Sequence, residues 1–190
     1  MKINTVNFGA LEVGGEEIIT FPEGILGFPE LQRYCLVDPG DDTLILWLQS
    51  LDDARIAFAV LEPKIFKTDY IVKLSAQELK LLRLDSINQS IVFTILTIPR
   101  GDATQMTANL KAPIVVNLKE QVGRQVVLQE NEYTLKHLMF RELKAQLATI
   151  EASKAAQAKE QARIATSLPI NQTATRQVLF CTLTGLTISP

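Results

Sequence analysis

Short apolar runs separated by turn residues recur along the first 135 positions of the chain. The runs are rich in β-branched and aromatic side chains, which is typical of strands, and glycine, proline and aspartate punctuate them as they do in tight turns. About ten such runs with one small helix predict a mainly β fold, either a β-barrel or a β-sandwich. The expected strands are two or three within residues 1–21, then 33–37, 43–50, 55–60, one around Tyr70, 91–98, 114–116 and 126–128.

One predicted strand pair, 114–116 with 126–128, organises the rest of the domain. Pro113 stands at the start of the first run, where a missing N–H costs least. The polar segment 117–125, which contains Gly123, reads as a long solvated connection between the two strands. A strand pair alone is not stable in water, so further sheet must cover its apolar face.

Two helices are expected beside the strands. Ser75 is placed to cap a short helix, because Glu78 follows three residues later in a capping-box arrangement. After Tyr133 the apolar spacing changes to steps of three and four, which predicts a C-terminal helix over 136–166. The apolar stripe of that helix consists of Leu135, Met139, Leu143, Leu147 and Ile150.

The predicted organisation is therefore a β domain over 1–135, an added helix over 136–166 and a tail over 167–190. The tail is partly apolar but has no place in the strand count. The pattern leaves open whether the tail is disordered, a loose strand or a docking segment.

The segment F-P-E-G-I-L-G-F-P-E, residues 21–30, carries large apolar side chains on a backbone that proline and glycine keep irregular. It is either a buried loop that plugs one end of the barrel or a partly exposed apolar ledge for a partner. On the second interpretation Phe21 and Phe28 are buried supports, and an apolar tip with acidic neighbours suits a basic or amphipathic helical partner. The candidate partner-binding residues are Glu23, Ile25 and Leu26, with Asp69 and Tyr70 extending the same surface.

Charge is unevenly distributed along the 190 residues, although the formal net charge is only −2. Residues 1–62 have eleven acidic and three basic side chains, a balance of −8, whereas residues 136–190 have a balance of +4. An acidic body repels a phosphate backbone, so we expect no direct binding of nucleic acid. The acidic surface is either simply solvated or a face that meets a basic protein.

No apolar run approaches the ~18 residues of a membrane span, and the first residues lack the apolar core of a signal peptide. We therefore expect a cytoplasmic protein without membrane contact. Its two cysteines, Cys35 and Cys181, are expected to be free thiols.

The sequence offers little that could support catalysis. His137 is the only histidine, is expected on a helix face, and has no cysteine or second histidine nearby for a zinc site. Two aspartate pairs, 41–42 and 52–53, occupy predicted turns, where aspartate is favoured for its own hydrogen bonds. We find no nucleophile elbow or cofactor fingerprint, and expect an interaction protein without cofactor or metal rather than an enzyme. A small ligand-binding β-barrel is the alternative.

Several segments in fixed order resemble the flagellar assembly factor FliW family of bacteria. Singly these motifs are weak, but their order is specific, and together they cover about residues 1–135. The segment from Arg141 onward exceeds the usual length of the family. The segments are F-P-E-G-I-L-G-F (21–28), L-W-L-Q-S (46–50), A-F-A-V-L-E-P (57–63), F-K-T-D-Y (66–70) and N-L-K-A-P-I-V-V-N (109–117), followed by 125–128 and Tyr133.

The resemblance implies a non-enzymatic cytoplasmic factor with a small antiparallel β-barrel-like fold. Members of this family bind newly made flagellin. They also bind and antagonise the RNA-binding translational regulator CsrA, which couples flagellin synthesis to its secretion.

Overall fold

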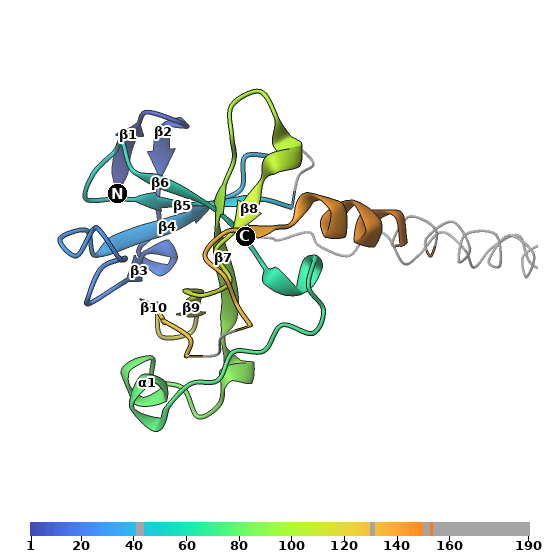
Figure 1. Ribbon diagram of the computed structural model, residues 1–190. Helices are drawn as coiled ribbons and strands as arrows, with labels where there is room; N and C mark the ends of the chain where they lie inside the picture. The colour runs from blue at the N-terminus through green and yellow to red at the C-terminus, as the bar shows by residue number, and fades with distance from the viewer. Residues whose placement is uncertain (41–43, 130–131, 150–152, 154–190) are drawn as a thin grey trace, which may run out of the picture. The chain divides into compact units, whose positions relative to one another are not determined.

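Seven strands close into a barrel within the part of the chain that the computed structural model describes, namely residues 1–40, 44–129, 132–149 and 153. Neighbours around the ring are antiparallel except for one parallel junction, where β3 meets β10. The mainly β, barrel-like prediction is confirmed (Figure 1). In ring order the strands are β3 (Ile19–Thr20), β4 (Arg33–Val37), β5 (Leu46–Ser50), β6 (Ala57–Leu61), β7 (Ile91–Thr97), β9 (Ile114–Asn117) and β10 (Val122–Gln125), with β9 pairing with β7 to close the ring.

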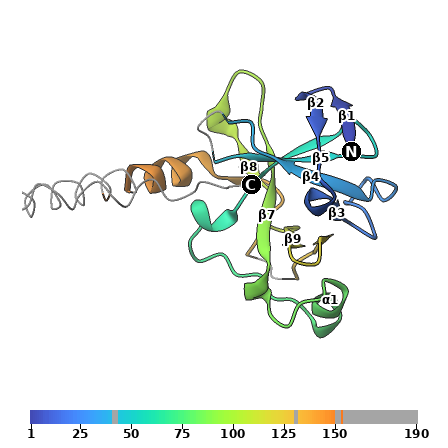
Figure 2. The same cartoon turned by 180° about the vertical axis from the view of Figure 1, so that it is seen from behind.

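Smaller elements extend or cover the ring. An antiparallel hairpin of β1 (Lys2–Thr5) and β2 (Gly9–Glu12) lies at the opposite end of the barrel from α1 (Ala76–Leu81), as both views show (Figures 1 and 2). Two short strands, β8 (Thr107–Ala108) and β11 (His137–Leu138), continue the sheet beyond the C-terminal half of β7. The 3-10 turns are η1 (Gly15–Glu17), η2 (Pro63–Ile65), η3 (Ile87–Gln89) and η4 (Ala103–Gln105).

The core is made by strands that are buried on both faces. In β9 all four residues are buried, and Val115 packs in one apolar cluster while Ile114 and Val116 pack in another. An uninterrupted apolar run is what such a doubly covered strand requires. The cluster that contains Ile114 also contains the fully buried rings of Phe21 and Tyr34. The segment 21–30, which we call the N-terminal loop, therefore belongs to the core.

The second strand of the predicted pair was misplaced. The connection between β9 and β10 is the short turn 118–121, with Gln121 in the left-handed region at φ 54°, so β10 begins earlier than the apolar run at 126–128. That run still continues the ladder, because the amides of Val126 and Leu128 donate to carbonyls of 113 and 111 at 2.9 Å. The turn, and not the apolar run, sets the register, and it places Gly123 inside a strand.

Three further sequence predictions concern Ser75, the segment around Tyr70 and His137. The Ser75 cap is confirmed, since its hydroxyl accepts from the Glu78 amide at 3.2 Å while the Glu78 carboxylate accepts from the Ser75 amide at 2.6 Å. The strand expected around Tyr70 is absent, because residues 70–74 have no ladder partner. His137 was wrongly placed on a helix: it pairs with Ala108 in β11, and the helix begins at residue 140.

Asp52 confirms the prediction of turn chemistry and holds the end of the N-terminal loop in place. Its carboxylate accepts from the amides of Gln32 and Arg33, both at 2.8 Å, and from the Arg33 guanidinium at 2.7 Å. Partial burial raises the pKa of Asp52, but these three hydrogen bonds together lower it below its ordinary value. Cys35 is a buried free thiol, whereas Cys181, the 41–42 pair and the tail lie outside the described residues.

Candidate functional site

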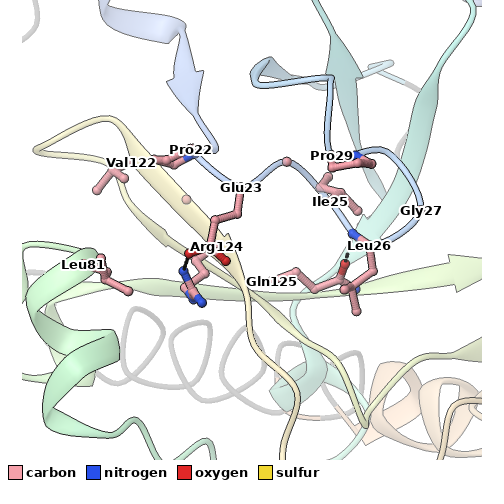
Figure 3. A pocket seen from close by; sticks show the side chains of 12 residues that line it. Pro22, Glu23, Ile25, Leu26, Gly27, Pro29, Leu81, Val122, Arg124 and Gln125 are labelled. Atoms are coloured by element: carbon pink, nitrogen blue, oxygen red, sulfur yellow. Dashed lines mark hydrogen bonds and ion pairs between the residues drawn. The ribbon is translucent and has the colours of Figure 1, made fainter.

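A hollow of about 320 Å³ lies where the N-terminal loop, β10 and α1 meet, and we call it the β10 hollow. The loop contributes residues 22–27 and Pro29, β10 contributes 122–125, and α1 contributes Leu81. Figure 3 shows Glu23 and Arg124 pointing toward each other in the middle, with Leu81 to one side and Leu26 to the other. Segments about a hundred positions apart in the sequence therefore share one surface.

Two tight turns give the loop its form. The amide of Gly24 donates to the Phe21 carbonyl at 2.9 Å, and the amide of Phe28 donates to the Ile25 carbonyl at 2.7 Å. Gly24 has φ 66° and Gly27 φ 91°, in the left-handed region that side chains disfavour. At Gly24 a Cβ would also collide with the Phe28 carbonyl and lie 2.6 Å from Pro29 Cα, so this position requires glycine.

The loop both plugs the barrel and presents one exposed apolar side chain, while binding of a partner there stays a prediction. Phe21 is fully buried with its ring edge-on to Tyr34 at 5.1 Å, and Ile25 is 1% exposed. Phe28 is half-buried against Phe58. Leu26, between these anchors, is 61% exposed. Buried neighbours on both sides thus hold one large apolar side chain in water at a fixed position.

The hollow exists because the parallel ladder between β3 and β10 stops after a single bridge, Thr20 with Val122. The next ladder position on the loop side is Pro22, which has no N–H to donate. Beyond it the polar contacts between the loop and β10 are made by side chains. Gln125 Oε1 accepts from the Leu26 amide at 3.0 Å, its Nε2 donates to the Ala112 carbonyl at 3.0 Å, and Arg124 pairs with Glu23. The opening between the loop and β10 therefore results from the proline at position 22, which ends the ladder.

Charge in the hollow is internally balanced. Arg124 donates to the Glu23 carboxylate in an ion pair, and the Arg124 side chain is the more buried of the two. The two charged side chains on the hollow are thus partners of each other, and most of the remaining side chains that line it are apolar. This composition favours contact with a protein surface that presents apolar side chains.

The described residues contain no cluster of three or more potential metal-ligating side chains. No helix among them is long and apolar enough to cross a bilayer. The Tyr34 hydroxyl is buried without a hydrogen-bond partner, and burial, with Asp52 and Glu30 nearby, raises its pKa. Tyr34 does not line the β10 hollow, so it remains a neutral core phenol.

The structure separates the five predicted site residues. Glu23 and Leu26 are exposed at the β10 hollow, and Ile25 lies buried beneath them. Tyr70 is 2% exposed and donates to the Leu110 carbonyl at 2.7 Å; it lines a different hollow that shares no residue with the first. Asp69 is exposed, pairs with Lys67 and lines neither. Asp69 and Tyr70 therefore do not extend the β10 hollow, while contact with a partner stays a prediction.

Sequence reasoning missed the residues that α1 and β10 bring to this hollow. Leu81 lies at the exposed end of α1, and nothing in the helical spacing distinguishes it from a core position. Arg124 and Gln125 were missed because the strand was expected at 126–128, whereas β10 spans Val122–Gln125. A shorter predicted turn between the strands would have brought both to the loop.

Comparison with known proteins places the barrel in a family. A family model described as FliW protein matches residues 2–139. The flagellar assembly factor FliW of Thermoanaerobacter pseudethanolicus is 39% identical over 145 residues, 76% of this chain and 96% of that protein. Its counterpart from Bdellovibrio bacteriovorus is 42% identical over 143 residues, 75% of this chain and 81% of that protein. A crystal structure of the flagellar assembly factor FliW superposes with a TM-score of 0.69 at 31% identity, covering 74% of this chain and 97% of its own.

Proposed function

This chain belongs to the FliW family and is a flagellar assembly factor, and on that premise we propose that it binds flagellin and the translational regulator CsrA. The observation that carries the proposal is the family match over residues 2–139, which includes the whole barrel and both sides of the β10 hollow. The factor works without catalysis, by occupying its partners. We place it in the cytoplasm, where flagellin and the regulator are made, with no direct role for nucleic acid or membrane.

Competition between the two partners would couple synthesis to export. When flagellin accumulates it occupies the factor, and CsrA is free to repress flagellin translation. When secretion drains flagellin, the factor returns to CsrA and antagonises it. The signal is therefore a change in which partner holds the factor.

The proposed contact surface is the exposed part of the β10 hollow. Leu26 supplies an apolar anchor whose position is fixed by the buried Ile25, and Glu23 supplies a neighbouring acidic group. Full burial of such an exposed leucine against a partner contributes about 1.5–3 kcal/mol, because its apolar surface is removed from water. Preorganisation matters, because a partner does not have to order the loop before it binds.

The acidic N-terminal part gives a physical route to antagonism. All three basic side chains in 1–62 are already in ion pairs, Lys2 with Glu12, Arg33 with Asp52 and Arg55 with Asp53. A set of acidic side chains in the same segment has no ion-pair partner among the described residues. A negative surface held beside a basic RNA-binding protein weakens its attraction for RNA without blocking the site. These unpaired acids are Glu16, Glu17, Glu30, Asp38 and Glu62.

The test is calorimetric titration of the full chain with purified flagellin and with CsrA from the same bacterium. We expect both to bind and flagellin to displace CsrA. Binding of neither protein would contradict the proposed function.

The surface is tested separately with Leu26→Asp, which should lower affinity for at least one partner by about 1–2 kcal/mol while the melting temperature stays unchanged. Leu138→Asp is the matched control, since Leu138 is also 61% exposed but lines neither hollow. An unchanged affinity in folded Leu26→Asp would remove the loop from the interface. A lowered melting transition would mean that Leu26 acts chiefly in the fold.

A further inference from the structure

A second hollow of about 400 Å³ opens beside the N-terminal half of β7, and we call it the β7 hollow. Its walls are formed by η2, by the extended segment at 70–72 and by η3. Ile71 on its wall is 60% exposed, and Ile87 and Val92 are half-buried. This surface shares no residue with the β10 hollow, so the inference below is independent of the proposed function.

The β7 hollow lies where β6 leaves its ladder with β7. The register pairs Val60 of β6 with Ile95 of β7, and Leu61 with Thr94. If β6 continued, its next hydrogen-bonding position would be residue 63, opposite Val92 of β7. Residue 63 is proline and has no N–H. Its carbonyl instead accepts from the amides at 66 and 67, at 3.2 and 2.8 Å, and the chain turns away into η2.

The direction of the Val92 peptide groups follows from the ladder on the other side of β7. The Ile95 carbonyl accepts from the Asn109 amide at 2.9 Å, so the main-chain N–H and C=O of Ile95 point away from β6. These groups alternate in direction along a strand, so the main-chain N–H and C=O of Thr94 and Val92 point toward β6. Pro63 cannot pair there, and the described residues supply no partner to the N–H and C=O of Val92. Val92 and Pro63 both line the hollow, so the gap between them, where these two groups lie, is a short open edge of the sheet.

We propose that the β7 hollow is a docking site for an extended segment of a partner protein, which adds as a short strand to β7 at Val92. An exposed strand edge selects an extended main chain, because only that conformation offers a donor and an acceptor at the matching spacing. Ile71 and Ile87 then receive one apolar side chain of the segment. Lys64 and Glu62 line the same space, and neither has an ion-pair partner among the described residues. The matching segment therefore has an apolar residue flanked by one acidic and one basic residue.

The probe is a blocked seven-residue peptide in which valines alternate with glutamate and lysine, titrated into the full ¹⁵N-labelled chain. We expect saturable shifts with a dissociation constant below about 1 mM, centred on the amides of Val92 and Ile71, with the Val92 amide moving downfield as it gains a hydrogen bond. A control peptide carries one N-methyl group on the central amide, which removes the donor for the Val92 carbonyl. It should bind about five-fold more weakly or worse.

Two variants of the chain complete the test. Ile71→Asp should abolish the shifts with little change in melting temperature, because the side chain is mostly in water. Leu26→Asp, in the β10 hollow, should leave peptide binding unchanged. The proposal is overturned if no saturable shift appears, if the shifts centre on the β10 hollow, or if N-methylation has no effect. The N-methylated peptide tests the unmodified chain, so the result does not depend on how Ile71→Asp folds.

Discussion

Gly123→Ala should destabilise the barrel through a single long-range contact with Phe21. A Cβ at position 123 would lie 2.7 Å from Phe21 Cε1 and 2.8 Å from Cε2, and closer still to Cζ. The ring cannot easily retreat, because it is fully buried against Tyr34. The backbone at position 123 is ordinary strand, where alanine alone would gain about 0.5–1 kcal/mol over glycine. Overpacking of a closed core costs about 1–3 kcal/mol, so the collision decides the sign.

A double-mutant cycle isolates this contact. Phe21→Leu removes all three ring atoms that the new Cβ would meet, at a cost of about 1–2 kcal/mol for the lost apolar volume. In that variant Gly123→Ala should be neutral or slightly stabilising. The interaction energy between the two substitutions should therefore be about 1–3 kcal/mol in favour of the double variant. Urea unfolding followed by circular dichroism measures all four corners of the cycle.

An equal cost of Gly123→Ala with and without Phe21→Leu would refute the reasoning. It would mean that glycine is required at position 123 for a backbone reason, or that the ring moves at no cost. A functional consequence accompanies the stability effect, because Phe21 begins the loop that positions Leu26. We expect the single variant Gly123→Ala to weaken partner binding more than its loss of stability alone explains.

Three further predictions concern stability and charge. Asp52→Ala removes the acceptor for two main-chain amides and for Arg33, and should cost about 1–2 kcal/mol near neutral pH. Because the folded pKa of Asp52 lies below the unfolded value of about 3.9, the stability that Asp52 contributes is complete above that value and is lost as the pH falls through the folded pKa. The free energies of unfolding of the unmodified chain and of Asp52→Ala should therefore converge between about pH 7 and about pH 2. A constant difference between them would contradict the assignment. Affinity for a basic regulator should fall as salt rises, since residues 1–62 have a balance of −8 and the Debye length is only ~8 Å at physiological salt; a salt-independent affinity would show that apolar contacts dominate. A chain truncated after Phe140 keeps the buried Met139 and should unfold cooperatively with nearly full stability, whereas a molten product would place the following helix in the core.

Local signals in the sequence identified most of the elements correctly. The apolar run at 114–116 and the strand at 33–37 were found because a strand buried in a barrel needs uninterrupted or alternating apolar residues. The Ser75 cap was found because its partner Glu78 is three residues away, within one turn of helix. These correct predictions all concern residues close together in the sequence, whose interactions do not depend on how the rest of the chain folds.

Tertiary structure decided which loop residues reach water and where the barrel stays open. Ile25 and Leu26 are adjacent and chemically alike, yet one is 1% and the other 61% exposed, because two glycine turns rotate one of them toward the core. Pro22 and Pro63 can be read directly in the sequence, but each ends a ladder only because of the strand that lies opposite it.

That opposing strand is known only from register, and register depends on which distant segments pair and on a one-residue choice in each turn. The sequence by itself determined a mainly β chain with an irregular apolar loop. The pairing of segments about a hundred residues apart determined the two hollows, since a closed ring fixes the partner of every strand at once.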